Sequence, residues 1–146
     1  MDKSKWEKVK LGDVCDKASS NIVISKEDIT QEGYSLYGAS GEIGKLSYFH
    51  QDKEYIGLVK DGSGVGRVEI YPPQSSLVGT MQYLFPKNGC SLKYLRYLLI
   101  SLNLAKYSQG AAIPHIYYRN YKNEDVLLPP LSEQRAIAEE LDGIQS

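Results

Sequence analysis

The pattern of hydrophobic and polar positions divides the chain into a β-rich first part and a helical second part. Residues 6–14 alternate apolar and polar side chains and then reach a Gly-Asp pair, which predicts a short strand and a turn. Residues 25–32 predict a brief helical turn capped by Ser25. Between Tyr34 and Phe85, short β-type segments alternate with glycines. This spacing predicts a twisted antiparallel or mixed sheet with tight connections.

A stripe of leucines then predicts an amphipathic helix that starts after Ser91, a good N-cap, and ends before Gly110. The stripe recurs at spacings of three and four residues and consists of Leu92, Leu95, Leu98, Leu99 and Leu102. We expect these leucines to lie in the core. The following residues, 108–125, predict a loop.

The chain closes with a short strand at 126–128, two prolines and a second helix. Pro129 and Pro130 prevent the strand from continuing inside a sheet and fix an extended approach to Ser132, the predicted cap. The helix carries a coiled-coil-like seam made of Ile137, Leu141 and Ile144. At 1.5 Å per residue the helix is only about 20 Å long. Such a helix needs either a partner or more chain.

These elements predict an α+β fold in one globular unit: a twisted, β-rich domain with packed helices over residues 1–128, and a C-terminal spacer helix that starts at 129. The 146 residues are 42% hydrophobic and 24% charged, which is ordinary for a soluble protein. No apolar run reaches the roughly 18 residues of a membrane span, and the N-terminus lacks a secretory pattern. Cys15 and Cys90 form no CxxC pair. A cytoplasmic location with reduced thiols is therefore expected.

The net charge of −1 hides a strong asymmetry along the chain. Between Glu69 and Glu124 there is no acidic residue, whereas basic residues are frequent there: Lys87, Lys93, Arg96, Lys106, Arg119 and Lys122, with His115 among them. One interpretation is a solvated face whose counter-charges come from the acidic N-terminal half. The other is a surface that follows phosphates.

Catalytic and metal-binding patterns are missing from the sequence. The glycine-rich residues 62–66 lack the register of a hydrolase elbow and the lysine and hydroxyl pair of a P-loop, so a structural hairpin is favoured. His50 and His115, like the two cysteines, do not have the spacing of metal ligands. The sequence therefore indicates a protein that is not an enzyme and that holds no metal.

Four segments in order carry a resemblance to a known family. They are "WEKVKLGDVCD" at the start, "YGASGEIGKLSYF" and "DGSGVGRVEIY" in the middle, and "LPPLSEQRAIAEEL" at the end. The chain resembles the target recognition domain of the specificity subunit of type I restriction-modification systems, and the last segment is the most specific part of the match.

The resemblance implies a non-catalytic domain that grips one half of a split site in double-stranded DNA, followed by a helix that sets the distance to the second half-site. It also implies docking to methyltransferase subunits. S-adenosylmethionine, ATP and Mg²⁺ would belong to the partner subunits, so no cofactor is expected here.

Members of the family that the chain resembles usually carry two recognition domains and two spacer helices. With one domain, the chain is either a piece of a longer subunit or a half-subunit that pairs with a second recognition domain or with its own copy. Twofold pairing would give an interrupted palindrome as the target.

The chemistry of the side chains suggests where DNA would be contacted. Cations neutralise phosphates, and amides and guanidinium groups read base edges. The candidates are Lys45, Lys60, Ser63, Arg67, Gln109, His115, Tyr118, Arg119, Asn120 and Lys122, and the small residues 110–112 would permit close approach. The alternative for Tyr117 or Tyr121 is packing in the core, which is the favoured interpretation for any single tyrosine.

Two other functions remain open. The chain could be a protein-interaction module that does not bind DNA and that uses its C-terminal amphipathic helix. It could also be a nuclease, although the predicted DNA-facing half has no acidic cluster for a metal.

Overall fold

The computed structural model describes residues 3–110 and 112–145, with the backbone alone for residues 144 and 145. Its strands are β1 (Glu7–Lys10), β2 (Cys15–Ser19), β3 (Tyr34–Gly38), β4 (Gly41–Leu46), β5 (Tyr55–Val59), β6 (Val68–Tyr71), β7 (Ser76–Leu77), β8 (Met81–Pro86) and β9 (Asp125–Leu128). Its α-helices are α1 (Leu11–Val14), α2 (Leu92–Leu102), α3 (Tyr118–Tyr121) and α4 (Leu131–Gln145), and the 3₁₀ helices are η1 (Ile24–Lys26) and η2 (Leu104–Tyr107). The predicted α+β fold is confirmed.

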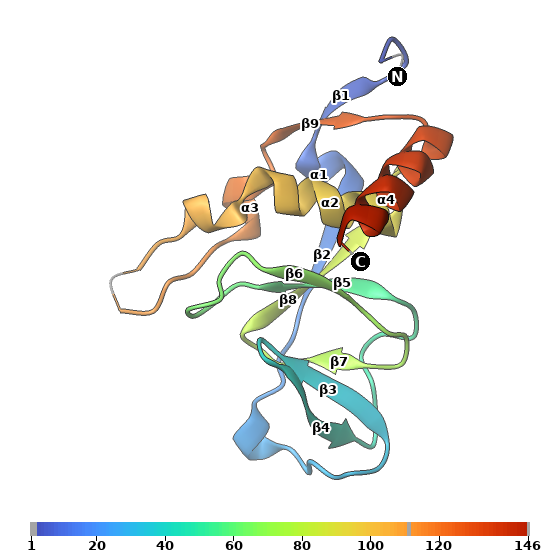
Figure 1. The fold of residues 1–146 in the computed structure, drawn as a ribbon. Helices are drawn as coiled ribbons and strands as arrows, with labels where there is room; N and C mark the ends of the chain where they lie inside the picture. The colour runs from blue at the N-terminus through green and yellow to red at the C-terminus, as the bar shows by residue number, and fades with distance from the viewer. Residues whose placement is uncertain (1–2, 111, 146) are drawn as a thin grey trace.

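The strands form three sheets that follow one another along the molecule (Figure 1). β1 and β9 pair at the same end as the helices. The central sheet is antiparallel, with the order β2-β8-β5-β6. The third sheet, β4-β3-β7, lies at the opposite end and contains one parallel pair.

The central sheet has an apolar core on each face because β5 and β8 are buried on both sides. Ile56, Leu58 and Leu84 are fully buried in the core that the helices cover. Tyr55 and Tyr83 belong to the second core, which extends toward the three-stranded sheet. The four-stranded sheet therefore serves as a common wall for both ends of the domain.

The leucine-rich helix forms as predicted, with Ser91 as its cap: the Ser91 hydroxyl accepts a hydrogen bond from the backbone N–H of Tyr94 at 3.1 Å. Leu95 and Leu99 are fully buried, and the other leucines of the stripe pack against the same core. The helix ends earlier than Gly110. Asn103 takes a left-handed conformation (φ 50°), after which the chain continues as η2.

The C-terminal helix is fastened to the domain by its first turn. Gln134 is fully buried: its amide nitrogen donates to the carbonyls of Gly89 (2.7 Å) and Pro129 (2.8 Å), and its oxygen accepts from the Ser91 N–H (2.8 Å). Trp6 Nε1 donates to the Glu133 carboxylate at 2.9 Å. We call these contacts the latch. The domain itself, through α2, thus supplies a partner for the start of α4, and Ala138 is also buried there.

Several local predictions were wrong. Ser132 does not cap the last helix, because α4 starts at Leu131 and the Pro130 carbonyl accepts from the N–H groups of Glu133 and Gln134. Ser25 is not a cap either, since it lies inside η1.

The predicted turn after β1 is the short helix α1, whose residues Leu11 and Val14 both enter the core. The strand β2 and the helix α3 lie in segments for which no element was predicted. No helix in the described part of the chain has the length and apolar character needed to cross a bilayer.

Candidate nucleic-acid interface

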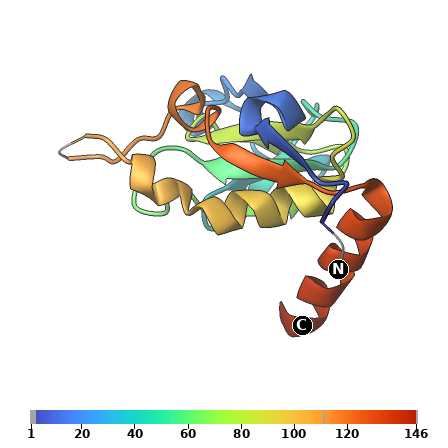
Figure 2. The ribbon, with the colours of Figure 1, turned by 90° about the horizontal axis from the view of Figure 1, so that it is seen from above.

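Two loops that lie about fifty positions apart in the sequence are bonded together on one side of the domain. The Gly62 N–H donates to the Pro114 carbonyl at 2.9 Å, and the Ile116 N–H donates to the Lys60 carbonyl at 2.9 Å. Both loops project to the left in Figure 1, and Figure 2 shows α4 leaving the domain at the opposite end. We call residues 60–66 and 112–117 the paired loops.

A short chain of polar contacts joins the side chains of the paired loops. The carboxylate of Asp61 lies 2.8 Å from Lys60 Nζ and 2.6 Å from His115 Nδ1. Burial by itself would raise the pKa of Asp61, but the hydrogen bonds from Lys60 and His115 outweigh it and hold this pKa below its ordinary value. Asp61 therefore remains a carboxylate and orients both basic groups.

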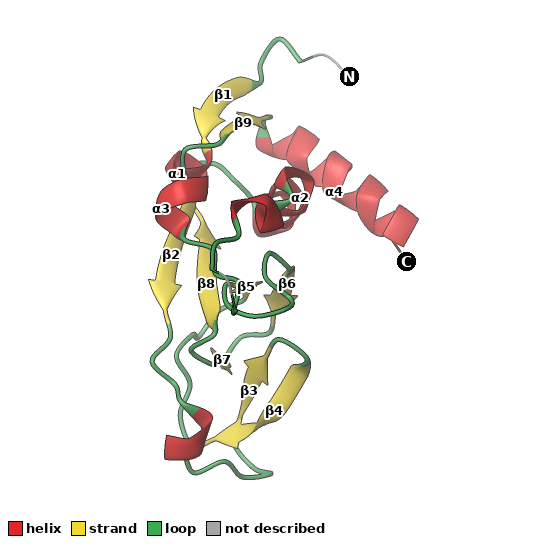
Figure 3. Ribbon diagram, turned by 90° about the vertical axis from the view of Figure 1, so that its left-hand side faces the viewer, coloured by secondary structure: helices red, strands yellow, loops and turns green. Residues whose placement is uncertain are grey.

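Beside the paired loops lies a depression of about 330 Å³, which we call the polar hollow. It is lined by Lys17, Ser19, Lys60, Gln82, Ile116, Tyr117, Tyr118 and Arg119. These residues come from β2, β8, the residue after β5, the segment before α3 and α3 itself. Figure 3 looks onto this side and shows α3 close to β2 and β8.

Two cation–aromatic pairs border the polar hollow. Arg119 lies over the ring of Tyr117, with 4.2 Å between the guanidinium carbon and the ring centroid, and Lys17 Nζ lies 5.5 Å from the ring centroid of Tyr118. The Tyr118 hydroxyl donates to the Cys15 carbonyl at 2.6 Å, which fixes its ring. Cations, a hydroxyl and an amide are thus held around one concave surface, a set that suits phosphate and base contacts.

Most of the basic residues in the second half of the chain are used elsewhere. Ion pairs join Lys87 to Asp16 (3.5 Å), Lys93 to Asp142 (3.5 Å), Arg96 to Glu69 (3.5 Å) and Lys106 to Glu124 (2.6 Å). All four residues are counter-charged, but only Asp16 and Glu69 come from the N-terminal half as that interpretation expects, whereas Asp142 and Glu124 come from the C-terminal half. The charge asymmetry along the sequence is therefore not a single basic face, and the cations of the polar hollow come from both halves of the chain.

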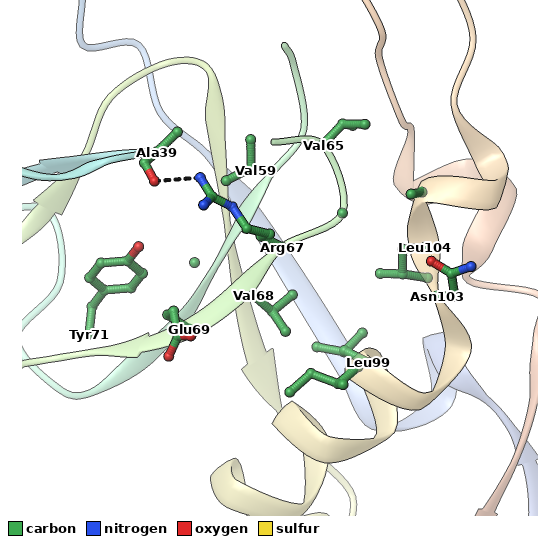
Figure 4. A pocket seen from close by; sticks show the side chains of 14 residues that line it. Ala39, Val59, Val65, Arg67, Val68, Glu69, Tyr71, Leu99, Asn103 and Leu104 are labelled. Atoms are coloured by element: carbon green, nitrogen blue, oxygen red, sulfur yellow. Dashed lines mark hydrogen bonds between the residues drawn. The ribbon is translucent and has the colours of Figure 1, made fainter. Parts of the chain in front are cut away.

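A second depression, of about 510 Å³, lies between the β5–β6 hairpin and the end of α2 (Figure 4). Arg67 is one of its lining residues, together with Glu69, Tyr71 and Asn103. The guanidinium of Arg67 donates to the Ala39 carbonyl at 2.7 Å, as the dashed line in Figure 4 shows. This second depression is separate from the polar hollow.

Comparison with known families identifies the chain. Residues 3–146 match the family described as "Type I restriction modification DNA specificity domain". The chain belongs to this family. The resemblance noted in the sequence is thereby confirmed, and no curated protein matches the chain.

Solved structures with the same fold include other specificity subunits. The specificity domain superposes on the S subunit of a type I restriction-modification system from M. genitalium with a TM-score of 0.79 and 23% identity, covering 96% of this chain and 39% of the other. It superposes on the HsdS subunit from Thermoanaerobacter tengcongensis with a TM-score of 0.67 and 22% identity, covering 97% and 38%. A third match comes from a structure described as the basis of complex assembly and conformational transition of the type I restriction-modification system, with a TM-score of 0.74, 22% identity and coverage of 97% and 38%. The specificity domain spans about two fifths of these chains, and the likeness shows the shared fold.

The structure gathers some of the predicted contact residues and separates others. Lys60, Tyr118 and Arg119 line the polar hollow. Ser63 and His115 lie in the paired loops, and Gln109 exchanges two backbone hydrogen bonds with His115 (2.7 and 2.8 Å).

Four predicted contact residues line neither the polar hollow nor the paired loops. Lys45 is on β4 in the three-stranded sheet, and Arg67 lines the second depression. Asn120 is on α3, while Lys122 follows α3 and packs near α1. Tyr121 is fully buried, so for this tyrosine the core interpretation is correct, whereas Tyr117 is 37% exposed. Ala111 lies outside the described residues.

The sequence interpretation missed the apolar lining residue Ile116 and three polar ones, Lys17, Ser19 and Gln82. Lys17 and Ser19 lie on β2, whose sequence shows no apolar alternation. Gln82 gave one usable signal: it is a polar residue inside the otherwise apolar strand "MQYLF".

The predicted seam of α4 is only partly available to a partner. Ile137 packs against the protein's own core, Leu141 is half-buried, and the side chain of Ile144 lies outside the described residues. The described residues contain no group of three or more His, Cys, Asp or Glu side chains placed to hold a metal ion.

Proposed function

We propose that this specificity domain recognises one half of a bipartite sequence in double-stranded DNA and that the polar hollow and the paired loops form the contact surface. The observation that supports this most directly is the polar hollow, where Lys17, Lys60 and Arg119 surround a hydroxyl and an amide. Cations of this kind neutralise phosphates, and the polar groups between them suit base edges in the major groove.

Selection from a randomised duplex pool tests the proposal. The purified chain should retain a short motif, and its affinity should fall steeply with salt because each phosphate contact releases counterions. The absence of any enriched motif, both for the chain alone and with a methyltransferase subunit added, would refute the DNA function.

A matched pair of arginine substitutions locates the surface. Arg119→Ala should weaken binding by about 1–3 kcal/mol, because Arg119 borders the polar hollow. Arg135→Ala is the control, since Arg135 is exposed on α4 at the other end of the domain. Equal affinities for the two folded variants would remove Arg119 from the interface.

We further propose that α4 continues the domain toward a partner, either a methyltransferase subunit, a second recognition domain or another copy of the chain. A depression of about 350 Å³ between α2 and α4, bordered by Leu92, Ala138 and Ile70, would accept an apolar side chain. Sedimentation of the chain alone and mixed with a methyltransferase subunit tests this. A Leu141→Asp variant should lose the association, and the exposed Glu140→Ala should keep it. If α4 captures a partner while no duplex binds, the interaction-module alternative is favoured.

Within the assembly this chain would act without chemistry or cofactors of its own, and S-adenosylmethionine, ATP and Mg²⁺ would be bound by partner subunits. The family membership supports this assignment. Equilibrium dialysis of the chain with S-adenosylmethionine should show no binding, and incubation with Mg²⁺ and plasmid should leave the DNA intact. Cleavage by the chain alone would revive the nuclease alternative.

A further inference from the structure

Gln82 lies on β8 at a position where the sheet otherwise buries hydrocarbon. It is opposite Ser19 on β2 and Leu58 on β5. Because side chains on a strand alternate between faces, Gln82 shares its face with Leu84, and both Leu58 and Leu84 are fully buried. Gln82 itself is only 5% exposed, and it lies where this apolar face ends at the polar hollow.

The side-chain amide of Gln82 is the unpaired member of a set of buried polar side chains. The other buried polar side chains of the described residues, Ser75, Ser76 and Gln134, all make hydrogen bonds. For Gln82, no hydrogen-bond partner of the side chain is found among the residues that the structure describes. The amide atoms of Gln82 are not among the fully buried unpaired polar atoms of the described residues, so they reach the solvent of the polar hollow. Most of the side chain is nonetheless removed from water, and a leucine or methionine would suit the same apolar face better. Local conflicts of this kind concentrate at functional sites.

The surroundings of Gln82 indicate what its amide could bind. The polar hollow is open to solvent next to it, and Lys17 and Arg119 favour an anionic ligand nearby, whereas Lys60 is paired with Asp61. A carboxamide offers one acceptor and a donor group side by side. A phosphate would satisfy only the donor and would face the amide oxygen with another acceptor.

We infer that Gln82 is a sequence-reading residue that pairs with the major-groove edge of an adenine. Adenine presents an N6 donor beside an N7 acceptor, which matches both atoms of the carboxamide. Guanine presents two acceptors there and would leave the amide oxygen unpaired. The inference rests on the proposed DNA function and adds the base class and the residue that reads it.

Duplex selection with substituted chains tests the inference. In the wild-type motif, one position should be an adenine that Gln82→Met no longer specifies, with a loss of about tenfold in discrimination at that position. The remaining positions should be unchanged. Gln31→Met, the same chemical change at an exposed position, is the control and should keep the whole motif.

An atom-level probe follows from the same pairing. Replacing that adenine by 7-deazaadenine removes the N7 acceptor and should weaken the wild-type chain by several-fold without affecting Gln82→Met. The stability of Gln82→Met should equal or exceed that of wild type in urea, because the Gln82 amide makes no hydrogen bond within the described residues that the substitution would remove.

Three outcomes would overturn the inference, and they can be told apart. A wild-type chain that selects no motif refutes the proposed function and the inference together. A wild-type motif that Gln82→Met reproduces at every position leaves the function intact and excludes Gln82 as a reader. A Gln82→Met variant that is clearly less stable than wild type assigns the amide to folding.

Discussion

Substitution of Gln134 in the latch tests how much its hydrogen bonds contribute to attaching α4 to the domain. Gln134→Met keeps the length of the side chain and removes every hydrogen-bonding atom. Three backbone groups then lose their partners: the carbonyls of Gly89 and Pro129, and the N–H of Ser91. Because Gly89 is exposed and Ser91 is half-buried, water can satisfy those two groups in part, whereas Pro129 is buried.

The expected loss of stability follows from those exposures. An unsatisfied buried group costs about 1–3 kcal/mol, and a hydrogen bond that water can replace contributes about 1 kcal/mol. One buried carbonyl and two half-solvated groups together give about 3–5 kcal/mol. A domain of this size is stable by only about 5–15 kcal/mol, so the variant should be markedly weakened.

Urea unfolding measures this change, and the molecule carries its own local probe. Trp6 is the single tryptophan, and its Nε1 donates to Glu133 next to Gln134. If the helix detaches before the domain unfolds, Trp6 fluorescence in Gln134→Met should change at a lower urea concentration than far-UV circular dichroism. The control Gln31→Met should lie within about 0.5 kcal/mol of wild type. A Gln134→Met variant with the wild-type midpoint by both probes would refute the role of the latch.

Three further predictions concern buried groups. The hydroxyl of Tyr121 is fully buried and has no hydrogen-bond partner among the described residues, so Tyr121→Phe should leave stability in urea unchanged or raise it. The control Tyr94→Phe loses the hydrogen bond to the Leu127 carbonyl (2.9 Å) and should lower stability by about 1 kcal/mol. Burial lowers the pKa of His50, so near the ordinary His pKa of about 6.5 the unfolded chain binds more protons than the folded one. The free energy of unfolding should therefore fall as the pH drops through that region. His50→Gln should flatten the dependence of this free energy on pH between about pH 5 and 7.5. Burial raises the pKa of Cys15 and of Cys90 to about 12, so both thiols stay protonated at pH 8. Both should react with a disulfide reagent only when urea unfolds the chain. Rapid labelling of the native protein would contradict this.

Much of the fold could be predicted because its larger elements repeat in the sequence. The leucine stripe of α2 spans three turns, and each of its leucines contacts the core. The strands between residues 34 and 86 carry enough apolar and aromatic residues to be recognised between glycines. In long segments the spacing of the apolar residues repeats often enough to indicate helix or strand, because the same face is buried along the whole element.

The missed elements are short and are held by partners distant in sequence. β2 is an edge strand with the sequence CDKAS, and its pairing with β8 is what makes it a strand. The helix α3 has four residues, and it is anchored by the buried Tyr121. Neither segment has a periodic pattern of its own, so local propensity gives no signal.

The same reason limits what the sequence reveals of the polar hollow. Its lining residues run from Lys17 to Arg119, and they meet because β2 pairs with β8 and the paired loops bring Ile116 to Lys60. A search by spacing finds the basic loop at Arg119 but cannot find Gln82. Its polar side chain in an apolar strand becomes informative only when the hollow beside it is known.

The helix α2 connects the end of the domain that carries α4 with the end that carries the paired loops. Its N-terminus is bonded to Gln134, which holds the start of α4 behind Pro129 and Pro130. Its C-terminus passes through Asn103 and η2 into the segment that forms the paired loops.

If the polar hollow reads one half-site and α4 sets the distance to the next half-site, then α2 is the element that fixes the polar hollow relative to α4. Fixed spacing between half-sites requires such a rigid link, because a helix free to pivot at the prolines would present the second reader at many distances. Weakening the latch should therefore blur the preferred spacing of an assembled specificity subunit while leaving the sequence of each half-site unchanged, and selection of duplexes with variable spacers would measure this.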